Sequence, residues 1–273
     1  SGVLLFIVSA PLGLIGLRVI EGLGAGLFVA ASMAFVNTLP DHEQMSGYLI
    51  ASLNAGLVSG LIFGGYLAHH TAVPAAGIAF FTIISVIPAL LSAVLNENKK
   101  PEEGRDVLST IRTMVADFRW LWYSAVVLIG LTGVITSLYP EFSNAAPDQA
   151  GIWIASMSVA TVLSVLLVSH LKLPPVPTIR IAALFMAAGT ILTYFTPAGF
   201  PVVGAVVGIV MIAQMAFLAQ AGSQQGAAMG LFSTTSYLGM SLFPFMAGFI
   251  AETTTFFLAF IVMALAAITV SLT

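Results

Sequence analysis

The amino-acid sequence predicts an integral membrane protein that is built entirely from α-helices. Of its 273 residues, 59% are hydrophobic and only 7% carry a charge, whereas soluble domains have about 25% charged residues. The hydrophobic residues form runs long enough for a helix to cross a bilayer, which needs about 20 apolar residues. These runs do not alternate between apolar and polar residues, so they do not indicate a transmembrane β-barrel.

Complete hydrophobic spans follow one another along the chain, after one partial span at 1–10. The complete spans are 12–37, 46–68, 73–95, 118–139, 150–169, 177–195, 200–221, 226–250 and 254–273. Turn-forming residues separate them, as in "TLPDHEQ" and "YPEFSNAAPDQ". The partial span is interpreted as the end of a helix that starts before residue 1.

One long polar segment, 96–117, interrupts the hydrophobic pattern. It concentrates charged residues of both signs, and its second half has the pattern of an amphipathic helix at the membrane surface. The chain is therefore expected to consist of a first hydrophobic block at 1–95, this linker, and a second hydrophobic block at 118–273.

The distribution of charge predicts how the chain threads the membrane. Alternate threading places the basic residues of 99–119, Lys172 and Arg180 on one side. The loops on the other side carry acidic residues such as Glu141 and no Lys or Arg. Because basic loops stay in the cytoplasm, the linker 96–117 is expected to be cytoplasmic.

An internal repeat relates the two hydrophobic blocks. The segment "GYLIASLNAGLVSGLIFGGYLA" is similar to "GLFSTTSYLGMSLFPFMAGFIA". At a constant offset of 183, Gly47, Gly56 and Gly65 fall on Gly230, Gly239 and Gly248, and "MAFV" at 33–36 falls on "MAFL" at 215–218 at an offset of 182. Two adjacent helices that repeat in the same orientation predict two parallel, pseudo-symmetric halves.

The same offset predicts what precedes the first block. The second block begins near 118, so its counterpart would begin about 65 residues before residue 1. The expected fold is a polytopic bundle of two six-helix halves, of which the first two helices and most of the third are missing. Residues 1–95 would then be the remnant of the N-terminal half, from the end of helix three to helix six.

Two segments carry a resemblance to a known family. The segment "LRVIEGLGAGLFVAASMAFV" resembles the fourth helix of the major facilitator superfamily, in which an Arg is followed by a polar residue three positions on and then by a Gly-rich run. The matching residues are Arg18, Glu21, Gly22, Gly24 and Gly26. The segment "GAAMGLFSTTSYLGMSLFPFMAGF" is similar to the eleventh helix of that superfamily.

A third segment, "NAGLVSGLIFGG", resembles the fifth-helix motif of the proton-coupled drug antiporters in that superfamily. The matching residues are Gly56, Gly60, Gly64 and Gly65. Leu61 stands where the motif has Pro, and a Pro occurs instead in the equivalent helix of the second half, as Pro244. This departure bears on the antiporter assignment and leaves the fold unaffected.

The resemblance implies a secondary active transporter that moves a small organic solute or drug across the membrane by alternating access, with proton-coupled export as the leading form. Uptake of a small solute and a transport-inactive membrane sensor or assembly protein are the alternatives. The implied setting is a bacterial or archaeal cytoplasmic membrane, with the protein acting as a monomer on a small-molecule substrate and protons.

Other function classes lack support in the sequence. The chain has no basic stripe for nucleic acid and no cysteine. It contains no HExxH, GxSxG or Walker-type motif. We therefore expect no enzymatic activity, no cofactor and no metal.

Arg18 and Glu21 are the leading candidates for the transport pathway. Charges inside a membrane helix cost several kcal/mol unless they are paired or hydrated, and residues three apart share one helix face. Glu21 would accept a proton beside Arg18, or the two would form a static ion pair. The full set of candidate substrate and proton pathway residues is Arg18, Glu21, Asn54, Gln214 and Tyr237.

The polar and small residues within the other spans have two possible roles each. Asn54, Gln214 and Tyr237 would contact substrate or form interhelical hydrogen bonds. The glycines would allow close helix contact or act as hinges. The candidate packing or gating glycines are Gly22, Gly24, Gly26, Gly56, Gly60, Gly64, Gly65 and Gly239.

Overall fold

A computed structural model shows a bundle of α-helices without a strand among the described residues. The structure describes residues 11–36, 39, 42–70, 76–94, 107–171, 173–219 and 225–273. The predicted all-helical fold class is therefore confirmed. The partial span at 1–10 and the first part of the linker lie outside the described residues.

Apart from the short α4, the described helices correspond one by one to the predicted complete spans. They are α1 (Pro11–Val36), α2 (His42–His70), α3 (Ala76–Val94), α4 (Val107–Asp117), α5 (Arg119–Phe142), α6 (Pro147–Val168), α7 (Pro175–Phe195), α8 (Gly199–Leu218), α9 (Gln225–Thr253) and α10 (Phe256–Leu272). The short α4 is the helix that was predicted in the second half of the polar linker. The ends of the helices differ from the prediction by only a few residues.

Within the described residues, five helices contain segments that are long and apolar enough to cross a membrane. These segments are Gln44–Gly64, Arg119–Phe142, Asp148–Val168, Pro175–Phe195 and Gly199–Leu218. Large hydrophobic side chains also point outward, such as Leu27 (73% exposed), Leu167 (72%) and Phe245 (74%). Such extensive apolar exposure suits a surface that faces lipid, and the chain is an integral membrane protein.

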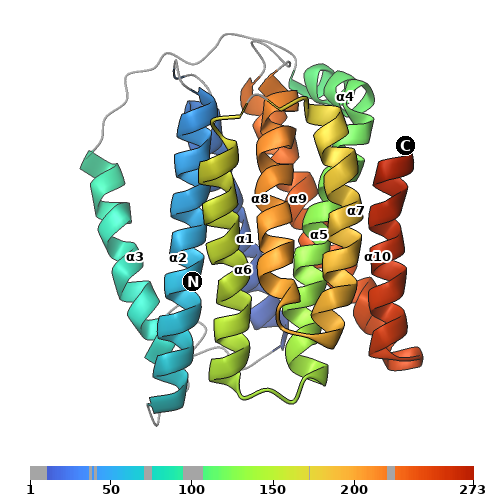
Figure 1. Ribbon diagram of the computed structural model, residues 1–273. Coiled ribbons are helices and arrows are strands. Elements are labelled where there is room, and N and C mark those ends of the chain that lie inside the picture. Colours follow the sequence, from blue (N-terminus) through green and yellow to red (C-terminus); the bar gives the residue numbers. More distant parts are fainter. Residues whose placement is uncertain are drawn as a thin grey trace.

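The second block forms the core of the bundle. Helices α5 to α10 run alternately up and down, starting from the end that carries α4 (Figure 1). Helix α5 packs along α9, α6 along α8, and α7 along both α8 and α10. Most of the fully buried large side chains come from this block, including Leu121, Ile179, Phe232 and Phe260.

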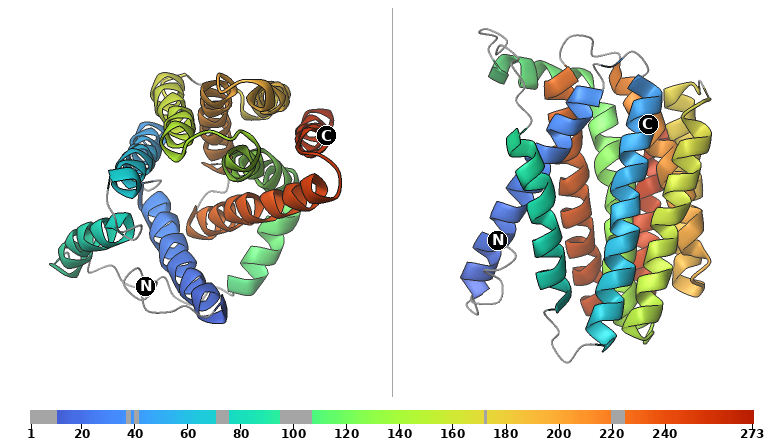
Figure 2. Two further views of the ribbon diagram at one scale, coloured as in Figure 1. Left: turned by 90° about the horizontal axis from the view of Figure 1, so that it is seen from below. Right: turned by 90° about the vertical axis from the view of Figure 1, so that its left-hand side faces the viewer.

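The first block lies against one side of this core. Helix α2 packs along α6, and α1 crosses beside α9 (Figure 2). Helix α3 packs on α2. Helix α4 lies across one end of the bundle, where the Trp122 indole Nε1 donates a hydrogen bond to the Met114 carbonyl at 3.0 Å. Since Met114 is buried, this bond fixes α4 to the start of α5.

The helix boundaries agree with the internal repeat. Helices α2 and α9 each have 29 residues. At the offset that superposes their glycines, the described range of α2, His42–His70, falls on the described range of α9, Gln225–Thr253. Helices α1 and α8 end at Val36 and Leu218, the last residues of the matching "MAFV" and "MAFL" segments. In each of these pairs the two helices run in the same direction through the bundle (Figure 1).

Glycines permit the closest helix contacts. A Cβ at Gly239 of α9 would overlap the main chain of Val126 in α5, and one at Gly133 of α5 would lie 2.7 Å from the Met240 carbonyl oxygen. In the α6–α8 pair, a Cβ at Gly204 would overlap the main chain of Met157. The Thr161 hydroxyl donates to the Gly204 carbonyl there, at 2.9 Å. Small residues thus let helix backbones approach closely in a bilayer, where the hydrophobic effect does not drive helices to associate.

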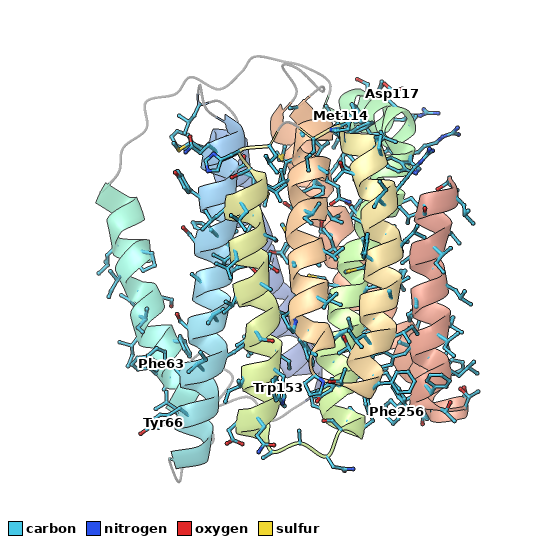
Figure 3. All side chains as sticks on the ribbon, viewed as in Figure 1. Phe63, Tyr66, Met114, Asp117, Trp153 and Phe256 are labelled. Carbon is cyan, nitrogen blue, oxygen red and sulfur yellow. The ribbon has the colours of Figure 1, made fainter. Side chains whose placement is uncertain are left out.

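The two ends of the bundle differ in charge and in aromatic content. The end with α4 carries Arg112, Asp117 and Arg119, whereas Glu141 lies at the far end of α5. Aromatic rings gather at that far end around Phe142, which stacks on Tyr194 at 5.1 Å and packs near Phe256. Figure 3 shows Asp117 and Phe256 at opposite ends. The described charges therefore segregate as the predicted threading requires.

This arrangement predicts that the two ends of the bundle lie on opposite sides of the membrane. The sequence contains no cysteine, so the exposed positions Asp117 and Glu252 can each carry a single thiol. In sealed vesicles of known orientation, we expect an impermeant maleimide to label Asp117→Cys and Glu252→Cys from opposite sides. Labelling of both from the same side would contradict the membrane-spanning arrangement.

Candidate functional site

Helix α1 carries the charged pair that the sequence singles out. Arg18 and Glu21 lie three residues apart on α1, about one helical turn, and their side chains lie outside the described part of the structure. Gly22 and Gly24 are exposed, and no described atom lies within 4 Å of a Cβ built at either position. The α1 glycines therefore do not form a close helix contact in this structure.

Asn54 and Tyr237 occupy equivalent positions of the repeat but are not brought together. The Asn54 side-chain amide donates to the Ile50 carbonyl of its own helix at 2.9 Å. Tyr237 is 43% exposed on α9. Helices α2 and α9 do not contact each other in the part of the chain that the structure describes, so these two residues lie on separate surfaces.

Gln214 is the most deeply buried of the candidate polar residues. It is fully buried between α8 and α5, where its Nε2 donates to the Ser124 hydroxyl at 3.1 Å. The Ser124 hydroxyl in turn donates to the Leu121 carbonyl at 2.8 Å. The Gln214 carbonyl oxygen Oε1 has no hydrogen-bond partner. Gln214 thus forms an interhelical hydrogen bond and keeps one unused acceptor.

The hydroxyl-rich segment of α9 is satisfied largely within its own helix. Thr234 donates to the Gly230 carbonyl at 2.8 Å, and Ser236 donates to the Phe232 carbonyl at 2.7 Å. These two hydroxyls therefore bond to the preceding turn of α9. Ser233 is the exception, because its buried hydroxyl has no partner.

The α2 glycines are mostly open. No described atom lies within 4 Å of a Cβ at Gly56 or Gly60, and Gly64 meets only the Phe81 ring at 3.9 Å. The surroundings of Gly65 lie outside the described structure. Of the predicted packing glycines, Gly239 is the one in close backbone contact.

Sequence reasoning missed several residues that form close helix contacts. Gly133 and Gly204 were not singled out, nor was Ser124 as the partner of Gln214. The Gly204-Ala-Val-Val-Gly208 segment has the GxxxG spacing of tightly packed membrane helices, and this signal would have found Gly204. An isolated Ser in an apolar run gives no comparable signal.

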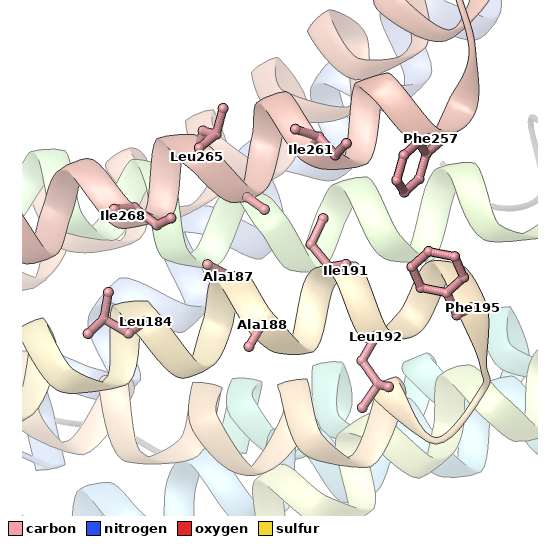
Figure 4. Close-up of a pocket in the computed structure, with 11 residues that line it drawn as sticks. Leu184, Ala187, Ala188, Ile191, Leu192, Phe195, Phe257, Ile261, Leu265 and Ile268 are labelled. Carbon is pink, nitrogen blue, oxygen red and sulfur yellow. The ribbon is translucent and has the colours of Figure 1, made fainter.

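Two apolar grooves open along the bundle. One, of about 660 Å³, lies between α7 and α10 and is lined by Leu184, Phe195, Phe257 and further apolar residues (Figure 4). The other, of about 400 Å³, lies between α2 and α6, and Ser156 is its one polar lining residue. Neither groove is lined by a candidate pathway residue. Among the described residues, no cluster of His, Cys, Asp or Glu is suited to a metal ion.

Comparison with protein families and with curated proteins identified no relative of this chain. No protein-family model matches the chain, and no curated protein matches it with significant similarity.

The Gln214–Ser124 contact predicts an asymmetric response to substitution. Ser124→Ala leaves the Gln214 amide buried without its partner and should destabilise the protein by about 1–3 kcal/mol. Gln214→Leu removes the unsatisfied carbonyl along with the amide, so we expect little loss of stability. Thermal unfolding in detergent measures both.

The same pair of variants separates a structural role from a transport role. If Gln214 serves packing alone, Gln214→Leu retains transport. Loss of transport in a stably folded Gln214→Leu protein would instead assign the amide to the substrate pathway. An equal loss of stability in both variants would contradict the described contact.

Proposed function

We propose that the protein is a secondary transporter of the major facilitator type, which moves a small organic solute or drug by alternating access. The observation that carries the proposal is the parallel repeat. At one constant offset the described range of α2 falls on that of α9, and the two helices run in the same direction. Parallel repeats related by an axis along the membrane normal are typical of that superfamily.

The contact between the two blocks suits a rocking motion. Helix α2 meets α6 near one end through Gly47, which lies beside Ser169, and near the other end where the Leu61 carbonyl approaches Gly151. Ile50 packs between them on Val165. Van der Waals contacts of this kind can be broken and reformed at low cost, because no charge or amide has to be desolvated anew.

Arg18 and Glu21 would couple transport to protons. Hydrocarbon penalises both charges, so they must meet each other, a polar partner or cavity water. Their spacing of three residues on α1 permits direct pairing. A carboxyl group that can exchange its Arg partner for a proton provides a coupling step for export.

The proposed topology places α4 in the cytoplasm. The described basic residues Arg112, Arg119 and Arg180 gather at the α4 end of the bundle, and the far ends of the helices carry Glu141 and Glu252. The positive-inside rule assigns the basic end to the cytoplasm.

Glu21→Gln is the decisive variant for this function. We expect it to abolish proton-driven accumulation while solute exchange or binding persists, because Gln keeps the shape of Glu but cannot carry the proton. The measurement is ethidium flux and pyranine-detected proton movement in proteoliposomes, extended to a panel of organic cations, anions and sugars.

A matched control is Glu252→Gln, which alters an exposed carboxylate at the end of α9. This variant should transport like the unmodified protein. Normal proton-driven accumulation of solute by the Glu21→Gln variant would show that Glu21 has only a structural role. Absence of any solute-dependent proton movement in the unmodified protein would contradict coupled transport and favour the transport-inactive sensor.

A further inference from the structure

A cluster of polar groups surrounds the last turn of α10, where α10 packs along both α5 and α7. The Arg180 guanidinium of α7 donates a hydrogen bond to the Thr273 main-chain oxygen at 2.8 Å. The Tyr123 hydroxyl of α5 is hydrogen-bonded to the Thr269 hydroxyl of α10. Tyr123 is 40% exposed, and tyrosines with an apolar ring and a polar tip are typical of the membrane interface. The cluster therefore lies at the depth of the lipid head groups.

The cluster carries positive charge from two helices. Arg180 is exposed, and its bond to Thr273 uses one of the five N–H donors of a guanidinium group. Arg119 is also exposed and lies one turn before Tyr123 on the same face of α5. A planar guanidinium group with free donors is well suited to bind a phosphate.

The groove between α7 and α10 begins next to this cluster. Leu184 lies one turn after Arg180 on α7, and Ile268 directly precedes Thr269 on α10. Both residues line the groove, and every other lining residue is apolar as well (Figure 4). At the opposite end of the groove lie Phe195 and Phe257, with ring centroids 5.7 Å apart. The groove is thus basic at its entrance and apolar along its length.

The dimensions of the groove match one lipid acyl chain. Leu184 and Phe195 are eleven residues apart, or about 16 Å along α7. One leaflet of a bilayer with a ~30 Å hydrocarbon core has about this depth. Small side chains, Ala187, Ala188 and Ala264, leave room between the larger lining residues.

We propose that an anionic phospholipid binds at this site, with its phosphate on Arg180 and one acyl chain in the groove between α7 and α10. The lipid belongs to the leaflet at the α4 end of the bundle. Charge-assisted hydrogen bonds to the phosphate give the site its preference for anionic lipid. The acyl chain adds van der Waals contacts with the groove. This inference depends on the membrane-spanning fold and is independent of transport.

Native mass spectrometry of the whole chain in detergent tests the head-group contact. The probes are dioleoylphosphatidylglycerol and dioleoylphosphatidylcholine, which have the same acyl chains and differ in net charge. We expect the unmodified protein to bind the anionic lipid about tenfold more tightly, which corresponds to one charge-assisted contact. Arg180→Gln should abolish this preference, and Arg180→Lys should retain most of it because the charge is kept.

The matched control for the charge is Arg112→Gln. It removes an exposed arginine from α4, at the same end of the bundle and outside the groove. This variant should keep the preference for anionic lipid. Equal loss in Arg112→Gln and Arg180→Gln would indicate a diffuse electrostatic attraction and overturn the proposed site. Equal binding of both lipids by the unmodified protein would overturn it as well.

A second pair of variants tests the acyl chain. Ala188 is an exposed residue of the groove, so Ala188→Leu fills the groove without entering the core. We expect it to weaken binding of both lipids several-fold. Ala31→Leu changes an exposed alanine of α1 and should bind both lipids like the unmodified protein. Unchanged lipid binding by Ala188→Leu would show that the acyl chain lies elsewhere.

Photolabelling locates the lipid and identifies its source. A phosphatidylglycerol with a diazirine in its acyl chain should label residues 184–195 and 257–268 more strongly than the matching phosphatidylcholine probe does. An excess of glycerol phosphate, which has no acyl chain, should leave this labelling unchanged. Loss of labelling in its presence would assign the site to a soluble phosphate. A dimer that is abolished by Ala188→Leu would instead assign the groove to a second copy of the chain, and either result would overturn the proposal.

Discussion

Close approach of helix backbones is the constraint on which the rest of this structure depends. Lipid tails are as apolar as the side chains, so burial of apolar surface gives little drive for helices to associate in a bilayer. The bundle relies on tight packing, as where Gly239 meets α5 and where Gly204 meets α6. The neighbours of a helix are therefore decided by the positions of a few residues that lack a side chain.

The bilayer imposes a second constraint, because it offers no water to polar groups. The Thr234 and Ser236 hydroxyls meet it by donating to carbonyls of their own helix, so a polar stretch in the sequence is not by itself a binding site. The Gln214 amide instead reaches Ser124 on another helix, and its carbonyl stays unsatisfied. An unused buried acceptor is costly, which makes Gln214 the residue at which packing and function are best separated.

The two main kinds of helix contact differ in a way that suits the proposed motion. Helices α5 and α9 interlock, since Met240 and the Pro244 ring of α9 pack directly on the main chain of α5 at Gly133. The α2–α6 contact is apolar, with Gly47 beside Ser169 and the Ile50 side chain buried on Val165. An interlocked contact keeps one block rigid, whereas an apolar contact between side chains allows two blocks to move against each other.

The sequence by itself determined the helices, their order and the repeat, because bilayer thickness requires long apolar runs and turn residues end them. It did not determine which glycines pack. Gly56 and Gly239 are equivalent in the repeat, yet among the described residues a close neighbour lies against Gly239 and none lies against Gly56, since a close contact needs a neighbour from elsewhere in the chain. The Gln214–Ser124 bond likewise joins residues 90 positions apart. Periodicity is a local property, and only the tertiary structure decides which helices become neighbours.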